Sequence, residues 1–119
     1  EFRFPSTRWI EGGELEFLLA AAPGGKKQEI TIGSLGWWSG KAPFMADPKS
    51  IAPTLTLCGE AFEPISIEPK RVVFRVQMRQ PFCLATLRTA TFVPAEIGEG
   101  SDRRKLGMDV VALRSEALL

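Results

Sequence analysis

Apolar and polar residues alternate along most of this chain, and the alternation restricts the folds open to it. The clearest run is RVVFRVQM at residues 71–78, and shorter runs occur at 14–20, 28–33, 54–58 and 108–115. A period of two belongs to a half-buried strand, because successive side chains point to opposite faces of a sheet. No segment of helical length has a period of 3.6, and at most one helical turn is expected near residues 94–98.

The strand-like runs are short and are separated by turn residues, with 11 Gly and 9 Pro in 119 positions. Gly24 and Gly25 predict a hairpin connection after residues 14–20, because paired glycines supply the positive φ of a tight turn. Pro64 and Pro69 bracket a short strand that is expected at a sheet edge. Seven or eight short strands at this spacing predict an all-β domain, an antiparallel β-sandwich or barrel, formed by residues 1–119 as one unit.

The composition excludes several kinds of chemistry. The chain has no His, which removes most hydrolytic zinc sites and every Ser-His-Asp triad. Its formal net charge of +1 provides no bulk attraction to nucleic acid or anionic lipid. The longest apolar run, FLLAAA at residues 17–22, is far shorter than the ~20 residues that span a bilayer. The first residue is Glu1 rather than Met, so the sequence is expected to be a trimmed or processed chain or a fragment. No signal-peptide pattern is visible, which leaves export open, and a cytoplasmic location is the expectation.

Cys58 and Cys83 are the only cysteines, and both fall in strand-like runs beside Leu57 and Leu84. The interpretation from sequence is two buried free thiols that behave as small apolar side chains. A disulfide needs Cα atoms about 6 Å apart, which sequence does not establish, so pairing stays open. No CxxC motif is present, and no His could assist a thiolate nucleophile.

Residues 34–53 interrupt the alternation and carry an aromatic pair, Trp37 and Trp38. Long irregular loops in a compact β domain are frequently functional. An exposed indole stacks on the apolar face of a sugar ring or on a base. Together with Trp9, these two residues are therefore candidates for ligand binding. The alternatives are that all three tryptophans close the core, or that one of the adjacent pair forms an exposed platform.

The charged residues predict no catalytic site. Glu96, Glu99 and Asp102 are close in sequence, but loop proximity does not set the carboxylate separation that glycoside hydrolysis needs. Neither a DxDxDG calcium loop nor a Gly-rich phosphate loop occurs, so no metal and no cofactor are expected. Arg75 and Arg79 share one strand face, a pattern typical of an oligonucleotide-binding barrel, and this alternative stays open.

The segment FVPAEIGEGSDRRKLGMDVVALRS, residues 92–115, carries Pro-x(3)-Gly followed by Asp-x-Arg-x-Leu-Gly and a final alternating strand. It resembles the end of the β-sandwich accessory domains attached to bacterial glycosyltransferases that build cell-envelope polysaccharides. The matching positions are Pro94, Gly98, Asp102, Arg104, Leu106 and Gly107, and GWWSG at 36–40 is similar to the Gly-Trp and Trp-Ser elements of those domains. The resemblance implies a jelly-roll-like sandwich without catalytic activity, which holds glycan or packs on a catalytic domain.

The residues of this motif also have a structural interpretation. Asp102 is expected to accept backbone amides in the turn before the last strand, and Arg104 is expected to pair with Asp102 or with a loop carbonyl. Gly107 would permit a sharp approach of the backbone into the last strand from Met108 onward, and Arg103 or Lys105 would be an additional ligand contact.

The sequence therefore predicts a non-catalytic, carbohydrate-associated β-sandwich module of a polysaccharide-synthesis or envelope system. The expected partners are a glycan and an adjacent glycosyltransferase domain or partner protein, with no membrane span. The alternatives are a structural or protein-interaction β domain and a single-stranded nucleic-acid-binding β-barrel. The candidate ligand-binding residues are Trp37, Trp38, Trp9 and Arg103, and no catalytic or metal-binding residue is expected.

Overall fold

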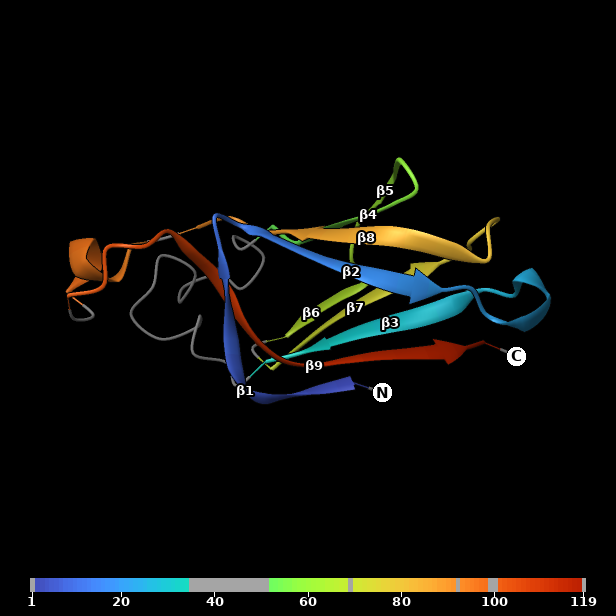
Figure 1. The fold of residues 1–119 in the computed structure, drawn as a ribbon, viewed down its shortest axis with the longest axis horizontal. Helices are drawn as coiled ribbons and strands as arrows, with labels where there is room; N and C mark the ends of the chain where they lie inside the picture. The colour runs from blue at the N-terminus through green and yellow to red at the C-terminus, as the bar shows by residue number, and fades with distance from the viewer. Residues whose placement is uncertain (1, 35–51, 69, 92, 99–100, 119) are drawn as a thin grey trace.

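The computed structural model describes residues 2–34, 52–68, 70–91, 93–98 and 101–118, and in this part of the chain nine strands form two antiparallel sheets (Figure 1). The strands are β1 (Phe2–Glu11), β2 (Glu14–Ala20), β3 (Gln28–Gly33), β4 (Thr54–Leu57), β5 (Glu60–Phe62), β6 (Ser66–Glu68), β7 (Arg71–Val76), β8 (Phe82–Arg88) and β9 (Leu106–Ala117). The first sheet has the order β1-β9-β3-β7-β6 and the second has the order β2-β8-β4-β5.

The order of the strands is that of a jelly roll. The chain pairs with itself as one rolled hairpin, β1 with β9, β2 with β8, β3 with β7 and β4 with β5. Rolling brings β9 beside β3 and β8 beside β4, which completes the two sheets. β6 is an additional edge strand beside β7. The predicted all-β antiparallel sandwich is confirmed, and it is an open pair of sheets rather than a closed barrel.

The core lies between the sheets and is built by the inward residues of the alternating runs. In β3, β4 and β8, buried positions alternate with more exposed ones along the whole strand. Around β7, Phe74 and Val76 are buried while Arg75 and Gln77 are exposed, as the alternation predicts. The largest fully buried side chains are Phe74, Ile10, Ile30, Ile32, Leu55, Leu87, Met108, Gln28, Val72 and Val110. Each apolar member of this set contributes about 1.5–3 kcal/mol by leaving water.

Two features differ from the expectation. Gly24 and Gly25 have positive φ values of 71° and 66°, as predicted, but they connect β2 to β3 in the other sheet and do not form a hairpin. The local pattern cannot distinguish the two cases, because strands that pair and strands that face one another across a core show the same alternation. The second feature is β5, which has three residues and is too short to show alternation, and it raises the number of strands from the expected seven or eight to nine.

Candidate functional site

The outer face of the second sheet carries three of the four large apolar side chains that are exposed in the described residues. β2 pairs with β8 in unbroken register, so that Leu18 lies opposite Leu84, and Ala20 lies opposite Phe82. The exposed fractions are 69% for Leu18, 56% for Leu84 and 60% for Phe82. Contiguous exposed apolar side chains mark interaction surfaces. We call Leu18, Ala20, Phe82 and Leu84 the apolar face.

The sequence contains a signal for the apolar face, which is an apolar residue at a position that the alternation assigns to the exposed side of a strand. Leu18 falls on the strand face that Glu14 and Glu16 also occupy, which is the exposed face of β2. A leucine on an otherwise polar face is the signal. In β8, Phe82 and Leu84 likewise hold exposed positions that alternate with buried Cys83 and Ala85. Phe82 and Leu84 are difficult to recognise as exposed from the sequence, because their buried neighbours are apolar as well.

A hollow of about 440 Å³ lies at the end of the apolar face, between the β2–β3 loop and the β7–β8 loop. Its lining consists of Ala20–Ala22, Gly25 and Met78–Phe82. Its volume is within the range of roughly 300–1,000 Å³ that is common for ligand pockets. We call it the loop-end pocket, and Phe82 belongs both to its lining and to the apolar face.

Two glutamine side chains hold the loops around this pocket. Buried Gln28 accepts a hydrogen bond from the backbone N of Ala22 at 2.9 Å, and its Nε2 donates to the carbonyl oxygen of Ala20 at 3.1 Å. Exposed Gln77 donates from Nε2 to the carbonyl oxygen of Gly25 at 3.0 Å. The first pair of bonds fixes the wall formed by the end of β2, and the second ties the β2–β3 loop to the end of β7.

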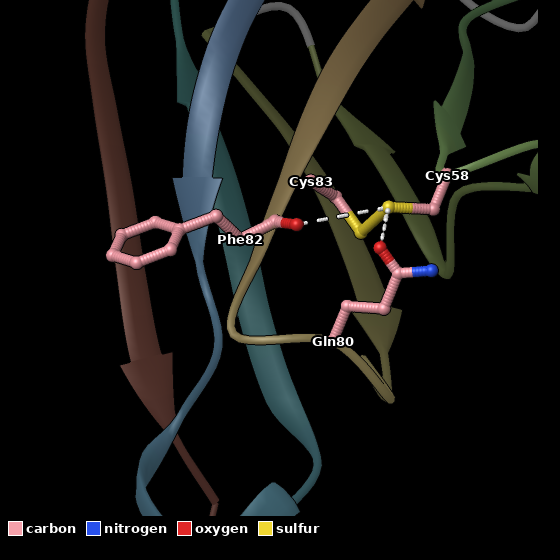
Figure 2. The surroundings of a disulfide bond; sticks show 4 residues. All are labelled: Cys58, Gln80, Phe82 and Cys83. Carbon is pink, nitrogen blue, oxygen red and sulfur yellow. Dashed lines mark hydrogen bonds between the residues drawn. A yellow bond between two sulfur atoms is a disulfide. The ribbon is translucent and has the colours of Figure 1, made fainter.

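A disulfide between Cys58 and Cys83 corrects the interpretation of these residues as free buried thiols (Figure 2). Their Cα atoms are 5.3 Å apart. Cys83 is an inward residue of β8 and is 4% exposed, but Cys58 is exposed in the turn between β4 and β5. The two turn residues, Cys58 and Gly59, have positive φ values of 46° and 84°, the pattern of a type I′ hairpin turn. This left-handed backbone takes Cys58 out of the alternation of β4, and its side chain reaches β8.

Oxygen atoms from the chain around the start of β8 contact this bridge. Oε1 of Gln80 lies 3.3 Å from Sγ of Cys58, and the carbonyl oxygen of Phe82 lies 3.8 Å from it (Figure 2). A disulfide sulfur carries no hydrogen, so a Cys58 thiol could donate to these oxygens only after reduction. The ring of Phe82 points away from the bridge (Figure 2). The bridge therefore anchors the backbone from which Phe82 projects.

The structure does not bring the sequence candidates together at this pocket. Trp37 and Trp38 lie outside the described residues. Trp9 is in β1, with its backbone opposite Asp109 of β9. Arg103 is exposed in the segment before β9. The carbonyl oxygen of nearby Lys105 accepts a hydrogen bond from the backbone N of Gly12, so this segment lies next to the start of β2. The loop-end pocket lies where β2 ends, and Figure 1 shows that the end of β2 and the start of β9 are at opposite ends of the sandwich. Arg103, three residues before β9, is therefore far from this pocket.

The expected pairing of Asp102 with Arg104 is confirmed. Nη2 of Arg104 lies 2.7 Å from Oδ2 of Asp102, and the backbone N of Arg104 donates to Oδ1 at 2.9 Å. The side-chain and backbone hydrogen bonds from Arg104 lower the pKa of Asp102 from 3.8 to about 2. These bonds close the turn that leads into β9, so this part of the C-terminal motif has a structural role.

Three arginines of the described strand faces are neutralised by glutamates on neighbouring strands. Three pairs lie in direct cross-strand register, with N–O distances of 3.0–3.4 Å: Arg88–Glu14, Arg75–Glu29 and Arg71–Glu68. Exposed pairs of this kind contribute only about 0–1 kcal/mol each to stability. Their consequence for function is that the described strand faces do not form the continuous basic surface expected of an oligonucleotide-binding sheet.

No family model, curated protein or solved structure matches this chain. Within the described residues, no group of three or more His, Cys, Asp or Glu side chains could hold a metal ion. The described part of the chain also contains no helix that is both long and apolar enough to cross a membrane. The apolar face and the loop-end pocket are therefore the features from which a function is inferred.

Proposed function

We propose that this chain is a non-catalytic jelly-roll module that binds carbohydrate beside a glycosyltransferase, in a polysaccharide-synthesis or envelope system. The observation that carries the proposal is the exposed ring of Phe82 at the lining of the loop-end pocket. Aromatic rings stack on the apolar C–H face of a sugar, and a hollow beside the ring offers room for polar groups of the ligand. Jelly rolls are a frequent architecture of lectin domains, and the resemblance of residues 92–115 supports the same class.

The lining of the pocket favours binding over reaction. Arg79 is its ionisable side chain, and no carboxylate is among the residues that line it. General acid–base and nucleophilic catalysis both require a group that accepts or donates a proton at the reacting atom. A guanidinium stays protonated at every physiological pH, so it serves as a binding group.

The disulfide supports a location in an oxidising compartment. Structural disulfides persist in secreted, periplasmic and cell-surface proteins and are rare in the reducing cytoplasm. The pairing of Cys58 with Cys83 therefore favours the envelope or the exterior of the cell over the cytoplasmic location expected from sequence.

Isothermal titration calorimetry with a panel of envelope oligosaccharides tests this function. Phe82→Ala should weaken binding by about 5- to 30-fold, which corresponds to about 1–2 kcal/mol for a lost stacking contact. Ile65→Ala is the matched control, because Ile65 is 52% exposed and lies outside the pocket lining. Trp37→Ala and Trp38→Ala test the sequence candidates in the same assay. Absence of binding to every oligosaccharide would remove the carbohydrate-binding role.

A second candidate function, a protein-interaction domain, is favoured by the cross-strand pair Leu18 and Leu84 beside the open edge of β2. Aliphatic side chains bury well against another protein and offer little to a sugar hydroxyl. Size-exclusion chromatography with light scattering should then show self-association without any glycan, and Leu18→Ser should abolish it while Ile65→Ser does not. A monomer at all concentrations would leave only a heterologous protein as the partner for this second function.

A further inference from the structure

We propose that the loop-end pocket recognises an acidic saccharide, such as a polyuronate, with Arg79 contacting the carboxylate and Phe82 supporting the sugar ring. The inference rests on the proposed carbohydrate-binding function and specifies the charge of the ligand. It concerns a site that the sequence candidates do not include, since neither the tryptophans nor Arg103 line this pocket.

Positive charge collects at this end of the sandwich. Arg79 lines the pocket, and Lys26 and Lys27 follow directly after Gly25, which also lines it. All three cations are exposed, and none forms an ion pair with an acid of the described residues. The arginines of the strand faces differ from them, since Arg75 and Arg88 each contact a cross-strand glutamate.

A hydrogen bond ties together the two loops that carry these cations. The hydrogen bond from Gln77 to the carbonyl oxygen of Gly25 joins the loop that carries the lysines to the end of β7, two residues before Arg79. Arg79 also lines an adjoining hollow of about 110 Å³, and that hollow contains one acid, Glu60. Glu60 is not among the residues that line the loop-end pocket, and it forms no ion pair with Arg79. An anion that enters the loop-end pocket therefore meets positive charge without a carboxylate among the lining residues.

The remaining lining suits a sugar more than a free anion. Ala20–Ala22 and Phe82 provide an apolar surface, while the planar guanidinium of Arg79 can form a bidentate contact with a carboxylate. A uronic acid combines the two chemistries in one residue, with an apolar C–H face on the ring and a carboxylate at C5. A free inorganic anion would use only the guanidinium.

The experiment compares one oligosaccharide in charged and neutral forms. Isothermal titration calorimetry should show that a short oligogalacturonate binds about tenfold or more tightly than its fully methyl-esterified form, the factor expected for one hydrogen bond to a charged group. The advantage of the acidic form should shrink as sodium chloride is raised, since salt screens exposed charges. Equal affinity for the acid and the ester would overturn the inference.

Arg79→Gln locates the charge that matters, and Arg103→Gln is its matched control at the opposite end of the molecule. Arg79→Gln should weaken oligogalacturonate binding about tenfold and leave the ester unaffected. Arg103→Gln removes the same charge and should change neither affinity. Because both side chains are exposed, thermal unfolding should confirm that both variants are folded. Equal losses in the two variants would show non-specific attraction and overturn the proposal.

Two further outcomes separate this inference from the broader function. Neutral oligosaccharides that bind with dependence on Phe82, Trp37 or Trp38, without preference for the acid, would keep the carbohydrate-binding function and refute the acidic site. A single-stranded oligonucleotide that binds more tightly than the oligogalacturonate, with the same dependence on Arg79, would refute it in favour of nucleic acid. Binding of no saccharide at all would refute both proposals.

Discussion

Gly107 is buried at the start of β9, where a side chain would meet neighbouring atoms. A Cβ there would lie 2.1 Å from Oγ1 of Thr89 and 3.4 Å from both the carbonyl oxygen of Ala90 and Cβ of Ile10. Gly107→Ala should therefore lower the free energy of unfolding by about 1–3 kcal/mol, as overpacked cores do, and urea denaturation measures it. Gly33→Ala, in β3, is the matched control, because its nearest contact would be an ordinary 3.4 Å to Cβ of Ala112.

A second substitution, at Thr89, tests whether the stability lost in Gly107→Ala comes from the contact with Oγ1 of Thr89. Its Oγ1 is buried and has no hydrogen-bond partner within the described residues, so its removal breaks no bond there. The double variant Gly107→Ala/Thr89→Ala should recover part of the lost stability, with a coupling energy of about 0.5–3 kcal/mol between the two sites. Strictly additive effects would show that the contact with Oγ1 is not the cause.

Asp102 makes the turn before β9 sensitive to acid. Its pKa of about 2 in the folded protein is below the ordinary 3.8, so its contribution is fully present above about pH 4 and is lost as the pH falls toward 2. Asp102→Asn should lower the urea midpoint at pH 7, and its difference from the wild type should shrink as the pH falls through about 2. Glu96→Gln, at an exposed carboxylate nearby in sequence, is the matched control. A difference between Asp102→Asn and wild type that persists unchanged at pH 2 would contradict the assignment.

At the scale of elements, Gln28 links strands of both sheets. Besides its bonds to Ala20 and Ala22, its Nε2 donates to Oγ of Ser115 in β9 at 3.0 Å. Gln28→Ala should lower the free energy of unfolding by about 2–4 kcal/mol, because it leaves buried backbone groups without their hydrogen-bond partner and opens a cavity. Gln77→Ala is the matched control, because Gln77 is exposed and makes one bond to the same loop. Equal losses in the two variants would refute the special role of Gln28.

The elements also show what alternation can predict and what it cannot. It identifies β2, β3, β4, β7 and the start of β9, because each of these strands has an apolar inward side. The turn at Pro94–Ile97 and the edge strand β6 follow from proline, which acts locally. The pairing of strands is not local, so the sequence pattern predicts a hairpin where the chain in fact crosses from β2 to β3 in the other sheet. The apolar face is difficult to predict for a related reason. The neighbours of Phe82 and Leu84 are apolar as well, so only Leu18, on the same strand face as Glu14 and Glu16, indicates its exposed side from sequence.

The disulfide shows the same limit at a single residue. Its partner on β8, Cys83, has the burial that the sequence pattern predicts. Cys58 does not, because a type I′ turn with a left-handed cysteine ends β4 at Leu57, and cysteine gives no sign of positive φ. The candidate tryptophans at 37 and 38 lie outside the described residues, so their assignment stays a prediction.

At the scale of the whole molecule, the jelly roll pairs segments that are far apart in sequence. In the described residues, the disulfide is the one covalent cross-link between such segments. The bridge joins the β4–β5 turn to β8 across a sequence separation of 25 residues. Inside that loop lie β5, β6 and β7, and β7 belongs to the opposite sheet. The cross-link therefore restricts strands of both layers in the unfolded chain.

Closing a loop of this length should stabilise the fold by about 3–4 kcal/mol, mainly by lowering the entropy of the unfolded chain. Cys58→Ser/Cys83→Ser should lower the free energy of unfolding by that amount in urea. It should also raise the slope against urea, because the unfolded chain without a cross-link exposes more surface. The wild-type protein treated with a reductant should match the double serine variant, and the reductant should not affect that variant. If the reductant leaves the wild-type urea midpoint unchanged, the oxidised and reduced chains unfold with the same free energy. That result would show that the disulfide does not stabilise the two layers.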